Sequence, residues 1–103
     1  EKIGAQLENI MIDEFQDTSS MQWNNFLPLV RDSLSNGNKN LIVGDVKQSI
    51  YLWRNSDWKL LDEQLDVDFS TNGINHKSLD TNWRSLPNII NFNTAIFESS
   101  STI

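Results

Sequence analysis

Two short apolar runs stand out along the chain, and each of them ends at acidic residues. The first lies within residues 7–12 and leads into Asp13 and Glu14, and the second lies within residues 40–45 and ends at Asp45. Nearly continuous apolar residues over about four to eight positions are typical of parallel strands that are covered on both faces. We therefore predict strands over 7–12 and 40–45, with the acidic residues at their carboxyl ends.

Between the two strands, apolar residues recur at the spacing of one helix face. They are Trp23, Phe26, Leu27, Val30 and Leu34. This stripe predicts a helix that begins at Thr18, Ser19 or Ser20, each a favourable N-cap residue, and that ends near residue 35. Pro28 lies inside the pattern and predicts a kink or a restarted helix. Gly37 suits the left-handed position that often follows a helix.

The second half of the chain predicts three weaker elements. Residues 57–65 favour a short helix, residues 70–75 favour a turn, and residues 77–83 favour a third strand because apolar and polar residues alternate there. Strands that alternate with helices imply an open, mainly parallel α/β sheet, here of three strands. The sequence contains no repeat, no low-complexity tract and no internal domain boundary, so its 103 residues predict one small domain.

The last predicted element is a helix that begins at Pro87. Proline is well suited to the first helical position, with Ser85 or Leu86 as the cap. The apolar residues of this helix are Ile89, Ile90, Phe92, Ile96 and Phe97. They cover much of its circumference, so we expect the helix to be packed on more than one side.

Composition excludes several classes of protein. The chain has 14 acidic and 8 basic residues, and its net charge of −6 argues against nucleic-acid binding by this chain alone. The absence of cysteine excludes disulfides and thiolate metal sites, and a single histidine, His76, disfavours a histidine-based zinc site. No apolar run approaches the roughly twenty residues of a membrane span, and no signal-peptide pattern occurs. We expect no membrane partner and a cytoplasmic location. Four Trp and five Phe residues predict some self-association.

Three strings of residues carry chemistry that composition does not reveal. They are IDEFQDT at 12–18, VGDVKQSIYLWR at 43–54 and LDTNWRS at 79–85. In this order they resemble motifs II, III and IV of the superfamily 1 DNA helicases of the UvrD/Rep type. Lys47 before Gln48 resembles the RecB/AddA helicase-nuclease subgroup. Val46 stands where that subgroup usually has Pro, and Leu52-Trp53 stands where it usually has Arg-Phe.

The resemblance implies a site for ATP and Mg²⁺. Asp13 matches the carboxylate that holds Mg²⁺ beside the β- and γ-phosphates, and Glu14 matches the general base that activates the attacking water. Gln48 matches the γ-phosphate sensor, and Arg84 matches the arginine that offsets charge in the transition state. Trp83 occupies the position of an aromatic residue, more often Tyr, that stacks on the nucleotide base. The alternative for Asp13 and Glu14 is a surface acid pair at the end of a strand.

The resemblance also implies contact with single-stranded DNA through Tyr51, Trp53 and Arg54. Aromatic rings stack on bases without reading their sequence, and an arginine adds a phosphate contact. Burial in the core is the alternative for Tyr51 and Trp53.

Three further polar residues lie within the first two strings. Gln16 and Asp17 match positions of the first motif, and capping of the following helix explains Asp17 equally well. Asp45 either ties the metal shell to its loop or caps a turn.

One motif of these helicases, the Gly-x-x-x-x-Gly-Lys-Ser/Thr phosphate loop, does not occur in the sequence. We therefore expect residues 1–103 to be part of a RecA-like P-loop NTPase domain, covering motifs II to IV, of an ATP-dependent DNA helicase or helicase-nuclease. A longer protein and its complex then supply the phosphate loop, the second motor half and any partner protein, and this chain alone hydrolyses no ATP. Two other classes remain open, a degenerate non-catalytic helicase-like module and an unrelated α/β phosphoacceptor domain.

Overall fold

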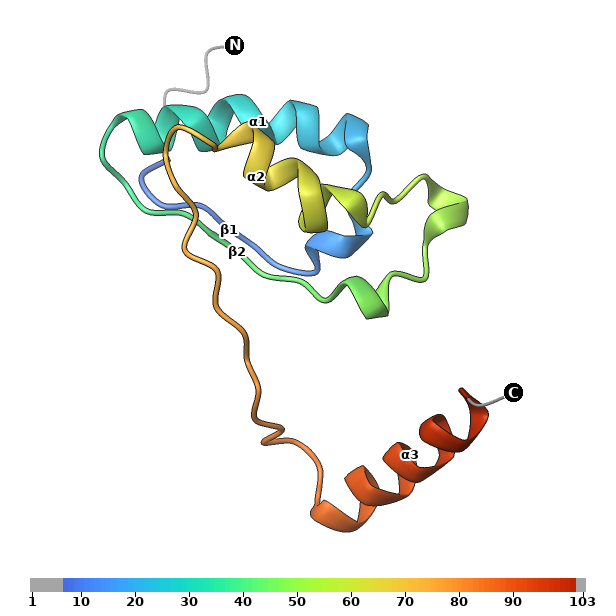
Figure 1. Ribbon diagram of the computed structural model, residues 1–103. Helices are drawn as coiled ribbons and strands as arrows, with labels where there is room; N and C mark the ends of the chain where they lie inside the picture. Colours follow the sequence, from blue (N-terminus) through green and yellow to red (C-terminus); the bar gives the residue numbers. More distant parts are fainter. Residues whose placement is uncertain (1–6, 102–103) are drawn as a thin grey trace.

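The computed structural model describes residues 7–101. Its regular elements are β1 (Met11–Ile12), η1 (Phe15–Asp17), α1 (Ser20–Ser35), β2 (Leu41–Ile42), η2 (Val46–Gln48), η3 (Leu52–Arg54), η4 (Leu60–Gln64), α2 (Leu65–Asp68) and α3 (Pro87–Ser100). The elements from β1 to α2 pack into one body, and α3 stands apart from it at the end of an extended segment (Figure 1).

The strands β1 and β2 pair in parallel, as the sequence predicts. Their register places Met11 opposite Leu41 and Ile12 opposite Ile42. Each strand is shorter than predicted, for two local reasons. Before β1, the amide of Ile10 bonds to the side chain of Asn40 at 2.8 Å, and after β1 the backbone turns sharply at Glu14. One face of the pair is half-buried beneath α1, whereas Met11 and Leu41 on the other face are exposed.

The helix α1 forms as its cap signals predict. Ser19 and Gln22 form a reciprocal capping box, in which the Gln22 amide donates to Ser19 Oγ at 3.2 Å and the Ser19 amide donates to Gln22 Oε1 at 2.9 Å. The helix continues through Pro28, so the alternative of a restarted helix is wrong. Gly37 takes the left-handed conformation with φ of 80°, and its amide donates to the Leu34 carbonyl at 3.0 Å, which ends the helix as predicted.

The core forms where α1, η1 and the η4–α2 stretch meet. Its buried members are Phe15, Trp23, Val30, Leu60, Leu65 and Phe69. Trp23 lies at the centre, with its ring edge-on to Phe15 at a centroid distance of 5.1 Å and to Phe69 at 6.1 Å. Its indole nitrogen donates to Asp68 Oδ2 at 2.8 Å. The predicted stripe is narrower than expected, because Phe26 is 47% exposed.

The helical stretch predicted over 57–65 begins and ends about three residues later than expected. It consists of η4, a π-helical turn, followed by α2, so that the Leu65 amide donates to the Leu60 carbonyl. Asp57 lies before the helix, where its Oδ1 accepts the Lys59 amide at 3.1 Å. Both Leu60 and Leu65 are buried, which explains why this stretch is held against α1.

The predicted third strand over 77–83 is wrong. Residues 74–83 adopt no regular secondary structure, and Leu79 and Trp83 are 90% and 91% exposed. A strand needs a hydrogen-bonded neighbour, and this segment runs away from β1 and β2 (Figure 1). Within the part of the chain that the structure describes, the sheet therefore has two strands instead of three.

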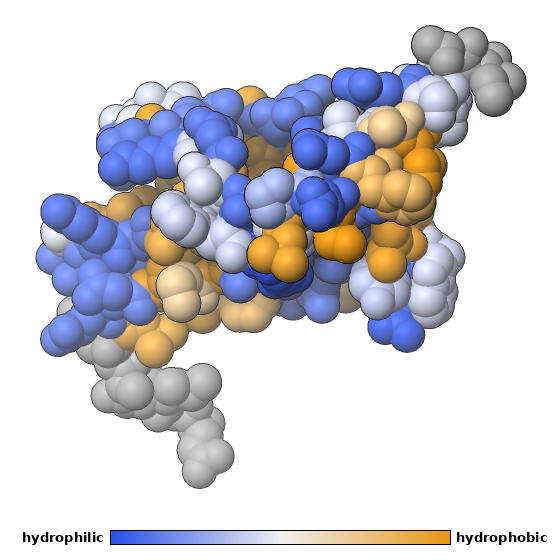
Figure 2. All heavy atoms as spheres, turned by 90° about the horizontal axis from the view of Figure 1, so that it is seen from below, coloured by the Kyte–Doolittle hydropathy of each residue, from blue (hydrophilic) through white to orange (hydrophobic). Residues whose placement is uncertain are grey.

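The helix α3 begins as predicted but is not packed as predicted. Leu86 is its N-cap and Pro87 its first residue, yet none of its described residues is buried. Its most exposed large apolar residues are Ile89, Phe92, Ile96 and Phe97. Figure 2 views the molecule from the side on which α3 lies and shows apolar side chains at the surface. The extended segment before α3 holds it away from the core, so its own sequence pattern cannot decide what it packs against.

Across residues 7–101, no helix combines the length and the apolar character that crossing a membrane requires.

Candidate functional site

The two adjacent acids sit in a sharp turn at the carboxyl end of β1, and both are exposed. Glu14 adopts a left-handed conformation, with φ of 50° and ψ of 38°, which is uncommon for a residue other than glycine. Asp13 supports the turn, because its Oδ1 accepts the Glu14 amide at 2.8 Å. Unusual backbone conformations of this kind cost free energy and cluster at functional sites. The turn therefore presents both carboxylates at one edge of the sheet.

Behind the acid pair lies the side chain of Gln16, which is only 1% exposed. Its Nε2 donates to Glu14 Oε2 at 2.7 Å, and its Oε1 accepts the Asp45 amide at 3.1 Å. Its carbonyl oxygen accepts the Ser49 hydroxyl at 3.4 Å. Gln16 thereby joins the turn after β1 to the loop after β2. Sequence reasoning matched it to the motif but gave it no role, since no local pattern distinguishes a buried, fully bonded amide from an exposed one.

The loop after β2 is organised by Asp45. Its Oδ2 accepts Gln48 Nε2 and its Oδ1 accepts the Lys47 amide, both at 3.0 Å, so it caps the turn η2 as one of the two predicted roles requires. The hydrogen bond from Gln48, and then that from the Lys47 amide, lower the pKa of Asp45. A lowered pKa keeps the carboxylate charged, so the bond to Gln48 is lost only when the pH falls through that lowered value.

The structure brings three of the four predicted hydrolysis residues to one edge of the sheet. Hydrogen bonds lead from Glu14 through Gln16 and Asp45 to Gln48, and Asp13 flanks Glu14. The structure does not bring the fourth, Arg84, or its neighbour Trp83 to this group. Both belong to the segment just before α3, which lies apart from the sheet (Figure 1), and Trp83 is 91% exposed.

The donor set at the acid pair fits a magnesium ion that is shared with phosphate groups. Mg²⁺ is usually held by about one or two carboxylates together with phosphate oxygens and water. Asp13 offers one such carboxylate, which is exposed and has only Oδ1 engaged by a backbone amide. Within residues 7–101 no group of three metal-ligating side chains occurs, so the chain does not build an all-protein metal cage.

A second group of predicted residues forms an exposed aromatic cluster after η2. The rings of Tyr51 and Trp53 lie edge to face, 6.1 Å apart, and the Arg54 guanidinium carbon lies 4.3 Å from the Trp53 ring centroid and 5.3 Å from that of Tyr51. Trp53 is 71% exposed, so burial in the core as its sole role is wrong, while Tyr51 is half-buried. Stacked cation and rings of this kind form a platform on which a planar group can bind.

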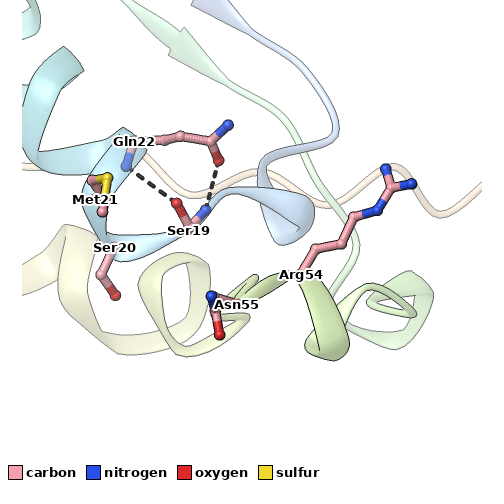
Figure 3. A pocket seen from close by; sticks show the side chains of 6 residues that line it. All are labelled: Ser19, Ser20, Met21, Gln22, Arg54 and Asn55. Carbon is pink, nitrogen blue, oxygen red and sulfur yellow. Dashed lines mark hydrogen bonds between the residues drawn. The ribbon is translucent and has the colours of Figure 1, made fainter.

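The aromatic cluster is anchored to the start of α1. Asp57 donates its amide to the Thr18 carbonyl at 3.0 Å, and Ser19 pairs with Ser56 in an isolated bridge. An open hollow of about 440 Å³ lies at this junction. Its lining residues are Ser19, Ser20, Met21, Gln22, Arg54 and Asn55. Figure 3 shows the Arg54 side chain reaching away from the capping box of α1.

The role of Asp17 as a helix cap is wrong. Ser19 caps α1 instead, and Asp17 lies in η1 with its Oδ1 buried and without a hydrogen-bond partner among the described residues. Asp17 lines a second hollow together with Gln22, Tyr51 and Arg54. The end of the acidic motif and the aromatic cluster are therefore direct neighbours.

Comparison with known proteins agrees with these features of the fold and of the two motifs. The chain belongs to the UvrD/REP helicase family, because the N-terminal domain of that family matches residues 1–69. The resemblance inferred from the three motifs is thus confirmed, and the unrelated phosphoacceptor class is excluded.

The relatives of the chain are components of helicase-nucleases. It is 40% identical over 89 residues to the RecBCD enzyme subunit RecB of Chlamydia muridarum, a match that covers 86% of this chain and 8% of the relative. It is 34% identical over 95 residues to an ATP-dependent helicase/nuclease protein of Streptococcus uberis, covering 90% and 7%. It is 39% identical over 99 residues to the exonuclease/helicase subunit RexA of Lactococcus lactis, covering 95% and 8%. The chain thus spans less than a tenth of these relatives. No solved structure gives a significant match.

Proposed function

We propose that this chain supplies part of the ATP-hydrolysis site and part of the single-stranded DNA interface of an ATP-dependent DNA helicase-nuclease of the RecB/AddA type. The family match and the names of the relatives support the class. Residues 1–103 are then part of a RecA-like domain, and the phosphate loop and second motor half come from elsewhere in a longer protein. The intact enzyme couples ATP hydrolysis to movement along DNA.

The hydrogen-bonded path from Glu14 to Gln48 carries this proposal. In it, Glu14 is the general base that orients and deprotonates the attacking water, and Gln48 senses the γ-phosphate through its neutral amide. Asp13 would hold Mg²⁺, which supplies electrostatic stabilisation of the phosphates when bound. Two residues that work on the same water and phosphate need a fixed separation, and the path provides it.

Arg84 and Trp83 complete the proposed nucleotide site on the strength of the family motif. Arg84 would offset the charge of the transition state, and Trp83 would stack on the base. Because both lie on the exposed segment before α3, these roles require that segment to approach the sheet edge from its present course.

The proposal predicts ATP hydrolysis that depends on DNA and on the longer protein. The full-length protein should hydrolyse ATP faster in the presence of an oligothymidylate, whereas the 103-residue chain should show no turnover, because it lacks the phosphate loop. A coupled phosphate-release assay measures both. A full-length protein without any ATPase activity would favour the degenerate non-catalytic module, and robust turnover by the chain alone would contradict the division of the site between segments.

The exposed aromatic cluster predicts a specific effect on DNA affinity. In the full-length protein, Trp53→Ala should weaken binding of a labelled oligothymidylate by about 5- to 150-fold, because stacking of one base contributes about 1–3 kcal/mol. ATP affinity without DNA should change little. Fluorescence anisotropy measures the DNA affinity. Leu52→Ala is the matched control, since Leu52 is also exposed in η3 and offers no ring. Equal DNA affinities of the two variants would remove Trp53 from the interface.

A further inference from the structure

We propose that Gln16 is a positioning residue that locks the general base to the phosphate-sensing loop, so that Glu14 and Gln48 keep one relative placement. This inference rests on the proposed function, because it gives the two residues a shared task. Neither the family match nor the motif comparison assigns Gln16 any role. The argument depends on its burial, on its three hydrogen bonds and on the glycine beside it.

The Gln16 side chain is enclosed, and both ends of its amide are used. It is 1% exposed, its Nε2 donates to the Glu14 carboxylate, and its Oε1 accepts from the backbone of Asp45. A buried amide in this state has one orientation, since a flip of the group would place donor against donor and acceptor against acceptor. The direction of the bond to Glu14 is therefore fixed by the bond to Asp45.

Space for this amide is reserved by Gly44. A Cβ atom at position 44 would lie 2.9 Å from Gln16 Oε1, 2.9 Å from Leu61 Cδ2 and 3.2 Å from the Phe15 backbone nitrogen. Any side chain there would displace the Gln16 amide or its surroundings. Gly44 is thus required by close approach of the amide, even though its backbone does not adopt a positive φ.

Glu14 needs such a restraint because its own side chain is exposed. The left-handed backbone fixes where the side chain starts, but the carboxylate has several rotamers available in solvent. A general base must lie within hydrogen-bond reach of the water that it deprotonates. The 2.7 Å bond from Gln16 selects one placement of the Glu14 carboxylate among these rotamers.

The same amide transmits the position of the sensing loop. The Asp45 amide bonds to Gln16, and the Asp45 carboxylate bonds to Gln48. The Ser49 hydroxyl adds a contact to the Gln16 carbonyl at 3.4 Å. A displacement of Gln48 therefore moves Asp45, and through Gln16 it moves the Glu14 carboxylate. Base and sensor respond to the γ-phosphate as one unit.

The first test is a double-substitution cycle in the full-length protein. Gln16→Met removes both amide bonds at nearly constant volume and should lower kcat for ATP hydrolysis by about 10²-fold with little change in KM, since small misplacements of a catalytic group have effects of that size. In the Glu14→Gln background the same substitution should lower kcat no further. Gln64→Met is the matched control, because Gln64 is exposed and lies in η4.

The second test does not depend on activity. In the 103-residue chain, NMR should show that the side-chain amide protons of Gln16 exchange slowly with solvent and shift when Glu14→Gln or Gly44→Ala is introduced. Gly44→Ala keeps Gln16 in the sequence, so it remains informative if Gln16→Met does not fold. It should also lower kcat in the full-length protein.

The outcomes separate this inference from the proposed function. Normal turnover by Glu14→Gln would contradict the proposed function, and the NMR result would then still decide the Gln16 contacts. Loss of turnover in Glu14→Gln together with normal turnover in Gln16→Met would overturn the positioning role alone. Additive losses in the double variant, or rapidly exchanging Gln16 amide protons, would overturn it as well.

Discussion

Glu14→Gln in the full-length protein should lower kcat for ATP hydrolysis by about 10²- to 10⁴-fold, the usual contribution of a general base. The amide has the size of the carboxylate but cannot accept the proton of the attacking water. Its oxygen can still accept the hydrogen bond from Gln16, so the turn after β1 should stay intact. Nucleotide affinity should remain close to that of the unchanged protein, because the proposed metal and phosphate contacts lie on other residues.

Two measurements decide this prediction. Single-turnover hydrolysis reports the chemical step, and titration with a fluorescent ATP analogue reports nucleotide binding. Glu63→Gln is a matched control, because Glu63 is an exposed glutamate in η4, away from the acid pair. If Glu14→Gln and Glu63→Gln hydrolyse ATP at similar rates, Glu14 is not the base.

Trp23→Ala should reduce the free energy of unfolding of the 103-residue chain by about 3–5 kcal/mol, the range for truncation of a buried aromatic residue. Trp23 is 1% exposed and contacts Phe15 and Phe69 through ring edges. The substitution also removes the 2.8 Å hydrogen bond to the Asp68 carboxylate. Domains of this size are stable by only about 5–15 kcal/mol, so the variant should be close to unfolding.

Urea denaturation followed by circular dichroism measures this loss. Trp53→Ala serves as the matched control, because it makes the same truncation at a position that is 71% exposed, where changes are usually within about 0.5 kcal/mol. Equal losses in the two variants would show that the central packing of Trp23 is not what stabilises the body.

Local signals in the sequence predicted the elements that depend on local chemistry. Ser19 caps α1, Gly37 ends it in a left-handed conformation, and Pro87 begins α3, as their residue types require. The parallel pairing of β1 and β2 was also predicted, because two apolar runs joined by a helix have few other arrangements.

Features that depend on neighbours could not be predicted in the same way. Alternation over 77–83 suggested a strand, but a strand forms only where a free sheet edge lies beside it, and the segment departs from the sheet. The apolar circumference of α3 suggested burial, yet the residues that would cover it do not occur among those described. In both cases the sequence pattern describes a capacity for contact and leaves the partner unspecified.

The candidate site divides along the same line. Asp13, Glu14 and Gln48 were found from their motifs, and each lies just after a strand, where the ends of parallel strands meet at one edge. The role of Gln16 was missed, because its importance comes from contacts with Asp45, a residue far away in sequence. Tertiary geometry was needed to see that link.

The close fit between Gly44 and Gln16 has an evolutionary consequence. A chain that exchanged Gly44 for alanine would gain a methyl group where the amide oxygen of Gln16 now lies. Such a change becomes tolerable only after position 16 has taken a shorter side chain, and that step releases Glu14. The two positions therefore constrain each other's drift, and laboratory selection for faster variants should alter them jointly or leave both unchanged.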